Sequence, residues 1–252
     1  MDHVDATDTG GDLDHTDRAI RATASEDWQT AGEQYTLAAY GTLAGHEGFR
    51  REAFDERRTS AGTAVCHLVR AGLCYRLAGV EAAARNRAMQ GALVAVDQRR
   101  VRTGVDAAAC DELLGHCRGL AGETERAGEA YDRAAQGYAD AAVDDPAKAT
   151  TRPLLQAGTD LVTHLSRPDD VGWDDIHGTG SDALSRRVRF VRSRVRELLA
   201  ARIREGKLYA PRGSTEYGVD RFTCPACGSH DVNYVAEAVL CLRCNAVVEE
   251  RS

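Results

Sequence analysis

The sequence predicts a mainly α chain, an array of antiparallel α-hairpins, followed by a small β module that holds a metal ion. Three observations support this prediction. Helix-forming residues at helical spacing dominate the chain from Asp14 to about Ala142, and no proline occurs before Pro146. Short segments of this region repeat one another. Four of the eight cysteines fall in the last 30 residues, as two Cys-x-x-Cys pairs.

Composition sets the first limits on fold and function. The chain has 252 residues, of which 43% are hydrophobic, and this is enough for one large domain or for a medium domain with a small appendage. A net charge of -7 argues against nucleic-acid binding over the whole surface. Two lysines stand against 30 arginines, and 23 Asp against 16 Glu. This bias resembles that of extreme-halophile proteins, although a high-GC genome would produce much of it.

Four segments follow from local composition. Residues 1–13 are expected to form a disordered acidic tail, 14–205 a helical domain, 206–220 a linker, and 221–252 a second module. The N-terminal residues lack the apolar region of a signal peptide, and no stretch approaches 18 uncharged apolar residues, so a cytoplasmic protein is expected. The sequence predicts helices near residues 14–25, 27–44, 48–57, 62–78, 80–102, 106–121, 123–143, 153–166 and 182–205.

Internal similarity defines the helical domain further. The segment from Ala31 to Tyr35 is echoed 96 residues later, close to three units of 32, from Ala127 to Tyr131. Small residues allow two helices to approach closely, and the tyrosine fills the gap between hairpins. The pattern resembles the tetratricopeptide repeat (TPR), whose arrays bind peptides or proteins on a concave face. The Trp and closing Pro of that repeat are not at their places, and an ordinary helical bundle with Ala-rich interfaces is the alternative.

The strongest motif is a pair of cysteine turns, whose metal-binding residues are Cys224, Cys227, Cys241 and Cys244. Each Cys-x-x-Cys turns tightly, so two thiolates can point at one ion, and the following Gly228 and Asn245 tolerate a left-handed backbone. Residues 221–250 resemble a zinc ribbon. Four thiolates favour Zn²⁺ in a closed structural site. The alternatives are an iron site of rubredoxin type and a redox pair, which would need a βαβ context that is absent here.

The second motif is an arginine-rich helix over 182–205. Its apolar residues recur at intervals of four and three and make one stripe, which consists of Leu184, Val188, Val191, Val195 and Leu198. In the functional interpretation, the arginines contact nucleic-acid phosphates or an acidic partner. The candidate contacts are Arg186, Arg187, Arg189, Arg192, Arg194 and Arg196. In the structural interpretation, which we favour narrowly, the stripe caps the array and the outward arginines pair with nearby carboxylates.

The remaining cysteines are expected in the core, as small apolar side chains: Cys66, Cys74, Cys110 and Cys117. His67 and His116 lie beside them in sequence, so a second metal site is the alternative. No phosphate-binding Gly loop, Gly-x-Ser-x-Gly elbow or His-Glu-x-x-His pair occurs, so there is no catalytic motif to name.

These observations predict a non-enzymatic protein that acts as an adaptor or regulator. The resemblance to TPR arrays implies an unidentified protein partner, and the cysteines imply a structural Zn²⁺. The alternative is a nucleic-acid-binding transcriptional regulator that uses the helix over 182–205 together with the ribbon. Zinc ribbons serve both kinds of protein, so the fold does not decide between these functions.

Overall fold

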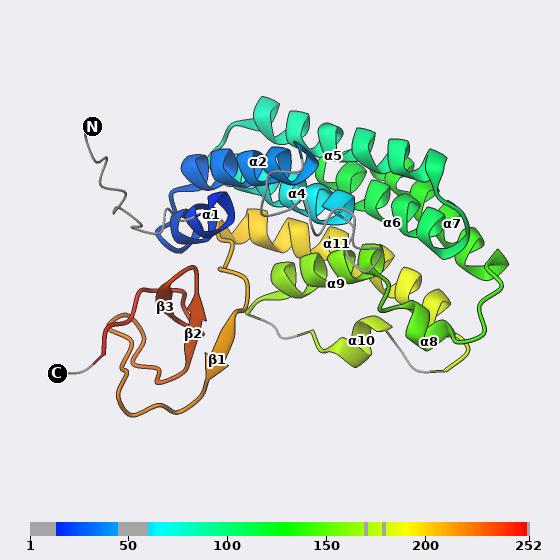
Figure 1. Cartoon of the computed structure of the whole chain (residues 1–252). Coiled ribbons are helices and arrows are strands. Elements are labelled where there is room, and N and C mark those ends of the chain that lie inside the picture. Colours follow the sequence, from blue (N-terminus) through cyan, green and yellow to red (C-terminus); the bar gives the residue numbers. More distant parts are fainter. Residues whose placement is uncertain (1–13, 45–59, 169–170, 178–179, 251–252) are drawn as a thin grey trace, which may run out of the picture.

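The chain is mainly helical and ends in a three-stranded antiparallel sheet (Figure 1). The computed structural model describes residues 14–44, 60–168, 171–177 and 180–250, so the predicted tail over 1–13 and the predicted helix over 48–57 lie outside it. The elements are α1 (His15–Ala24), α2 (Trp28–Ala44), α4 (Ser60–Leu77), α5 (Glu81–Val101), α6 (Gly104–Leu120), α7 (Thr124–Asp140), α8 (Pro146–Ala149), α9 (Pro153–Ser166), α10 (Trp173–His177), α11 (Ala183–Glu205), β1 (Ser214–Glu216), β2 (Val232–Val235) and β3 (Ala238–Cys241).

Three consecutive helix pairs are joined by the same turn. The pairs are α1–α2, α4–α5 and α6–α7, and each turn has a residue with positive φ: Glu26 at 59°, Gly79 at 76° and Gly122 at 80°. In every turn the N–H group of the residue after the positive-φ residue donates a hydrogen bond to a carbonyl near the end of the first helix. The bonds run from Asp27 to Ala22 O (2.9 Å), from Val80 to Tyr75 O (2.8 Å) and from Glu123 to Arg118 O (2.9 Å). This Schellman closure satisfies the last carbonyls of the helix and reverses the chain.

Counting from these turns places small residues at matching positions. We count from the residue with positive φ in each turn. Seven residues before it lie Ala19, Gly72 and Gly115, and five residues after it lie Ala31, Ala84 and Ala127. A Cβ at Gly115 would lie 2.6 Å from the ring of Tyr131, so the helices of this pair pack too closely for any side chain there.

Tyr35 and Tyr131 each lie nine residues after a turn. The 96 residues between these tyrosines therefore cover two unequal repeats, one of 53 residues from Glu26 to Gly79 and one of 43 from Gly79 to Gly122. They do not cover three units of 32.

One side of the helix pairs is covered by the later helices of the same chain. Helix α9 packs on α4 and α6, and α11 packs on α7, α6 and α9, running along the row of hairpins (Figure 1). The predicted apolar stripe of α11 is buried throughout, at Leu184, Val188, Val191, Val195 and Leu198. Helix α11 is therefore part of the main hydrophobic core.

The C-terminal sheet has the order β1-β2-β3, and β2 pairs with β3 so that Val232 faces Cys241. Strand β1 lies inside the range 206–220 that was expected to be a linker, and it pairs with β2. The core of this unit consists of five buried residues, Phe222, Cys224, Val232, Cys241 and Val248. So small a core does not supply enough apolar burial for an independent fold.

Candidate metal centre

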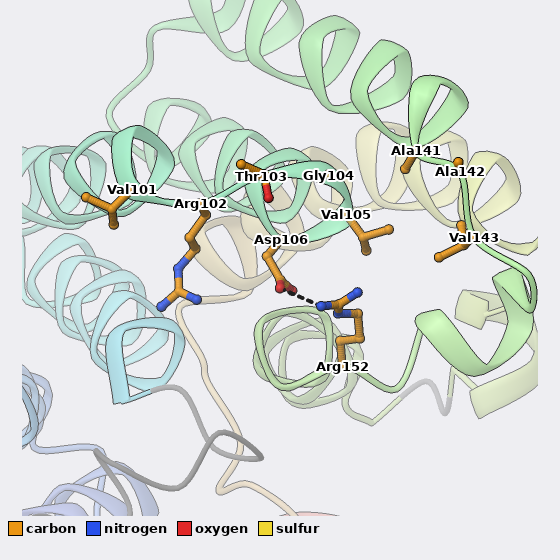
Figure 2. A pocket seen from close by; sticks show the side chains of 10 residues that line it. All are labelled: Val101, Arg102, Thr103, Gly104, Val105, Asp106, Ala141, Ala142, Val143 and Arg152. Atoms are coloured by element: carbon orange, nitrogen blue, oxygen red, sulfur yellow. Dashed lines mark hydrogen bonds and ion pairs between the residues drawn. The ribbon is translucent and has the colours of Figure 1, made fainter.

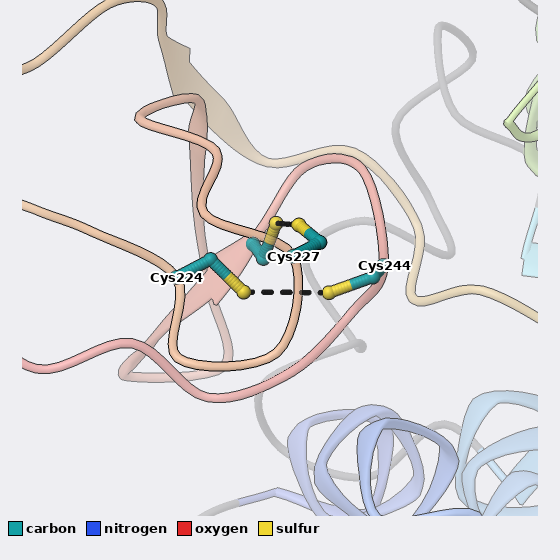
Figure 3. A group of neighbouring side chains, drawn as sticks. Cys224, Cys227 and Cys244 are labelled. Atoms are coloured by element: carbon teal, nitrogen blue, oxygen red, sulfur yellow. Dashed lines mark hydrogen bonds between the residues drawn. The ribbon is translucent and has the colours of Figure 1, made fainter.

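Two matching turns present the four cysteines (Figure 3). After the first pair, the amide of Gly228 donates to Cys224 O at 2.9 Å, and after the second, Asn245 donates to Cys241 O at 3.0 Å. Gly228 and Asn245 have φ values of 72° and 73°, the left-handed conformation expected from the sequence. The two turns thus aim their thiols at a common point.

The sulfur positions fit a single tetrahedral ion. Cys224 Sγ lies 3.4 Å from Cys244 Sγ, and Cys227 Sγ lies 3.5 Å from Cys241 Sγ, so each close contact joins one turn to the other (Figure 3). All four sulfur atoms lie within 4.8 Å of one another. Four thiolates around Zn²⁺, with bonds of about 2.3 Å, would stand about 3.8 Å apart. The cluster therefore has the donors and the dimensions for a thiophilic metal ion.

The ionisation of the thiols also favours a cation. Burial opposes thiolate formation at Cys224, but the N–H groups of Cys227 and Ala226 outweigh it and lower the Cys224 pKa to about 7. At Cys244, burial and the neighbouring thiols raise the pKa to about 12, and the Cys241 pKa is raised for the same reasons. Four adjacent thiolates are thus costly without a counter-ion, and a divalent metal would stabilise the deprotonated set.

The other cysteines do not join a metal cluster. Cys66, Cys74, Cys110 and Cys117 are buried in the helical core, and burial raises the Cys66 and Cys74 pKa values to about 12. Across the described ranges, the four C-terminal cysteines are the one group of three or more His, Cys, Asp or Glu side chains placed to share an ion. The interior cysteines therefore act as small core residues.

The second cysteine turn is held by side chains from outside the ribbon, at the end of α9 and directly after α11. Arg167, at the end of α9, is 2% exposed and donates to Ala210 O and to Leu242 O, the latter at 2.6 Å. Lys207 Nζ donates to Cys244 O at 3.2 Å. In return, the side chain of Asn245 accepts the amide of Ala210 at 2.9 Å. The roles of Arg167 and Lys207 were not predicted, because nothing in the local sequence pattern shows which distant carbonyl a side chain will reach.

A second contact joins the sheet to the first helix. Arg21 donates from Nε to Ala236 O at 2.7 Å and from Nη2 to Glu237 O at 3.1 Å, both in the β2–β3 turn. Ile20 packs beside this contact, in an apolar cluster with Ala210, Ala236 and Leu240. The ribbon-like unit therefore rests on the helical body through both its second cysteine turn and its hairpin turn.

The six candidate arginines of α11 have different environments. Arg186, Arg189, Arg192 and Arg196 are exposed, and Arg194 is half-buried. Arg192 pairs with Asp132, Arg194 with Glu197 at 3.0 Å and Arg186 with Asp182 at 4.0 Å. Arg187 is fully buried, so the expectation that it contacts an external partner from the outer face is wrong.

Arg187 instead forms the centre of a buried polar network. Its Nη2 lies 2.8 Å from Glu112 Oε1, and its Nη1 donates to Thr159 Oγ1 at 2.7 Å. Tyr138 donates to the other Glu112 oxygen at 3.0 Å, and Arg187 holds the Glu112 pKa below its usual value against the effect of burial. The network joins α6, α7, α9 and α11. One signal was available in the sequence, because Arg187 follows Leu184 by three residues, on the side of the apolar stripe.

A separate pocket of about 410 Å³ lies where α5 turns into α6 (Figure 2). Its charged side chains are already engaged: Asp106 pairs with Arg152 at 2.8 Å, and Arg102 donates to Gln98. These charged side chains are thus paired within the protein, and nothing in the pocket identifies a ligand. Within the described ranges, no helix combines the length and apolar character needed to span a bilayer.

The chain matches no protein-family model, and no curated protein or solved structure is significantly similar to it. Its functional assignment therefore depends on the geometry of the cysteine cluster and of the surfaces around it.

Proposed function

We propose that this protein is a zinc-binding interaction protein, in which a TPR-like helical body carries a docked zinc ribbon. The observation that carries the proposal is the convergence of four Sγ atoms, within 4.8 Å, on two turns of matching geometry. The TPR-like description is supported by three repeated turns with small residues at the same offsets. The zinc is structural, because four protein ligands complete a tetrahedral shell and leave no position for a substrate.

The partner surface in this proposal lies on the outer helices. Helices α9 and α11 pack on α4 and α6, so this side of the helix pairs is filled by the chain itself. On α2, three large apolar side chains are 41–45% exposed at three-residue spacing: Leu37, Tyr40 and Leu43. A helix face of this kind suits an apolar protein partner.

The test has a metal arm and a partner arm. Purified protein, reconstituted under reducing conditions, should contain one Zn per chain, and substantially less would contradict the metal assignment. For the partner arm, tagged protein is recovered from its native cells at native salt, and the bound proteins are identified. The double variant Leu37→Ser/Leu43→Ser should lose a partner that the wild type retains. Leu93→Ser, which changes a 64% exposed leucine on α5, is the matched control and should retain it.

The second candidate is a nucleic-acid-binding regulator, favoured by two arginines on α11. Arg189 and Arg196 are exposed and seven residues apart, and neither has a carboxylate within ion-pair distance in the described part of the chain. Such side chains are available to phosphates. Salt-dependent binding of the wild type to a DNA or RNA duplex, measured by titration at several salt concentrations, would support this candidate over the adaptor.

A further inference from the structure

The two cysteine turns differ in what surrounds them. The first turn is closed by its own neighbours, as in the bond from Cys224 N to Ser229 O. The second turn is also closed by its neighbours, but its carbonyls at Leu242 and Cys244 accept hydrogen bonds from Arg167 at the end of α9 and from Lys207 directly after α11. Only the second turn is therefore anchored from outside the ribbon by donors to its backbone carbonyls, among the contacts of the described residues.

The anchoring groups also have the appropriate charge. A Zn²⁺ ion with four thiolates has a net charge of about -2, and on the buried side of the cluster, at Cys224 and Cys241, nearby cations or N–H donors would offset part of that charge. Arg167 is almost fully buried, whereas the Lys207 side chain is 28% exposed and also pairs with Glu26 at 3.1 Å, so part of the Lys207 charge is already offset. Both are held near Tyr209, whose ring centroid lies 5.9 Å from Arg167 Cζ and 5.3 Å from Lys207 Nζ. Both side chains are thus held by packing around Tyr209, in the segment after α11.

We propose that Arg167 and Lys207 are positioning residues for the metal site, and that metal binding and docking of the ribbon on the helical body are coupled. The helical body holds the second cysteine turn in its ligating shape, which raises metal affinity. By linkage, the metal stabilises the docked arrangement to the same extent. This inference rests on the proposed zinc binding.

The coupling has a specific structural reporter. The amide of Ala210 donates to Asn245 Oδ1, so its protection depends on the second turn being in place against the segment after α11. The amide of Ala84 donates to Val80 O in the first turn of α5 and is the internal control. On metal removal, exchange at Ala210 should accelerate strongly, whereas exchange at Ala84 should change little.

The affinity test measures zinc transfer from the full-length protein to a chromophoric chelator. Arg167→Met and Lys207→Met should each weaken zinc binding about 10- to 100-fold, the range for residues that orient metal ligands. Arg167→Lys keeps the charge and one hydrogen bond, so it should fall between wild type and Arg167→Met. Arg204→Met removes an exposed arginine from the last turn of α11 and should bind zinc as wild type does. Far-UV circular dichroism checks that each variant is folded, and if Arg167→Met does not fold, Lys207→Met decides the result.

The outcomes separate this inference from the proposed function. A wild type that binds no zinc contradicts both. A wild type that binds one zinc, with unchanged affinity in Lys207→Met and in every folded Arg167 variant, overturns the coupling and leaves the zinc site in place. Equal Ala210 exchange with and without metal would overturn the reciprocal part. Weaker binding in the variants, together with faster Ala210 exchange without metal, supports the full proposal.

Discussion

The helical body and the C-terminal ribbon bring ionisable side chains together in different ways. In the body, the charges of Arg187 and Glu112 neutralise each other inside a large core of hydrophobic side chains from the helices. In the ribbon, four thiols converge on a five-residue core and have no cation of their own within the cluster. We therefore expect the body to fold on the free energy of its own contacts, whereas in the proposed function the ribbon depends on a bound metal ion.

The largest expected effect is therefore loss of the metal. Cys241→Ser should abolish zinc binding and unfold the ribbon, because structural zinc contributes about 10–16 kcal/mol of apparent binding free energy to such units. The helical body should remain folded, with helical circular dichroism close to that of the wild type. Metal analysis and limited proteolysis over 206–250 measure the effect. Cys110→Ala, in the helical core, is the control and should retain one zinc. An intact ribbon in Cys241→Ser would show that the ribbon does not depend on the metal for its fold.

The next effect breaks the buried pair of the body. Arg187→Met should reduce the free energy of unfolding by about 3–5 kcal/mol, because it leaves Glu112 charged and buried without its partner. The double variant Glu112→Gln/Arg187→Met should recover part of this loss. Denaturant unfolding of both, in a double-mutant cycle, gives the coupling energy.

The control for this cycle is the surface pair of the half-buried Arg194 and the exposed Glu197 on the same helix, where the corresponding change should cost less than about 1 kcal/mol. Equal costs for the two pairs would show that burial is not what makes the network important.

These two regions also differ in how far the sequence predicts them. The two cysteine turns follow from spacing, because a Cys-x-x-Cys turn brings its own two sulfurs together through local geometry. The helices and the α11 stripe likewise follow from periodicity. The partnership of Arg187 with Glu112 joins residues 75 positions apart, and the contact from Arg167 to Leu242 O joins residues that are also 75 apart. Such pairs depend on how helices pack in space, and no local pattern encodes that.

Acid should test the body through its buried histidines. Burial lowers the His116 pKa to about 4, with the nearby Glu112 opposing the shift, and burial lowers the His67 pKa to about 3. In the unfolded chain these histidines take up protons near pH 6.5, whereas in the folded protein they stay neutral to about pH 4. The free energy of unfolding is therefore highest above pH 6.5 and decreases as the pH falls toward 4. The expected loss is about 1.4 kcal/mol per pH unit for each histidine in this window.

Equilibrium unfolding between pH 7 and pH 4.5 measures this dependence, with helical circular dichroism as the probe so that metal release from the ribbon does not enter. His116→Gln should show a shallower dependence than wild type. A pH-independent free energy of unfolding would mean that the histidines are not kept neutral by burial.

A smaller effect distinguishes the two repeat tyrosines. The hydroxyl of Tyr131 lies 2.7 Å from His116 Nδ1, whereas that of Tyr35 is buried without a hydrogen-bond partner among the described residues. Tyr131→Phe should therefore cost about 1–2 kcal/mol, and Tyr35→Phe should be close to neutral. The two single variants are controls for each other, and thermal unfolding measures both. Equal losses would indicate that the two positions have the same environment despite their different partners.

The smallest expected effect on stability is that of the exposed arginines of α11. The triple variant Arg189→Gln/Arg192→Gln/Arg196→Gln changes only exposed side chains, one of them paired with an exposed Asp132, so each change should alter the free energy of unfolding by less than about 0.5 kcal/mol. The sequence alone favoured a role for these arginines in folding, and the exposure of all three now favours the opposite result.

Because stability should stay nearly constant in this variant, binding becomes the informative measurement. If the wild type binds DNA or RNA through these side chains, the log–log salt dependence should flatten by about one unit for each phosphate that the variant no longer neutralises. If the wild type shows no salt-dependent binding, the outer face of α11 is a solvated surface, and the exposed apolar residues of α2 remain the surface where a partner is expected. A large loss of stability in the triple variant would instead mean that α11 is stabilised by its exposed arginines as well as by its buried apolar stripe. Arg187 and its exposed neighbours would then contribute to the free energy of unfolding in the same way.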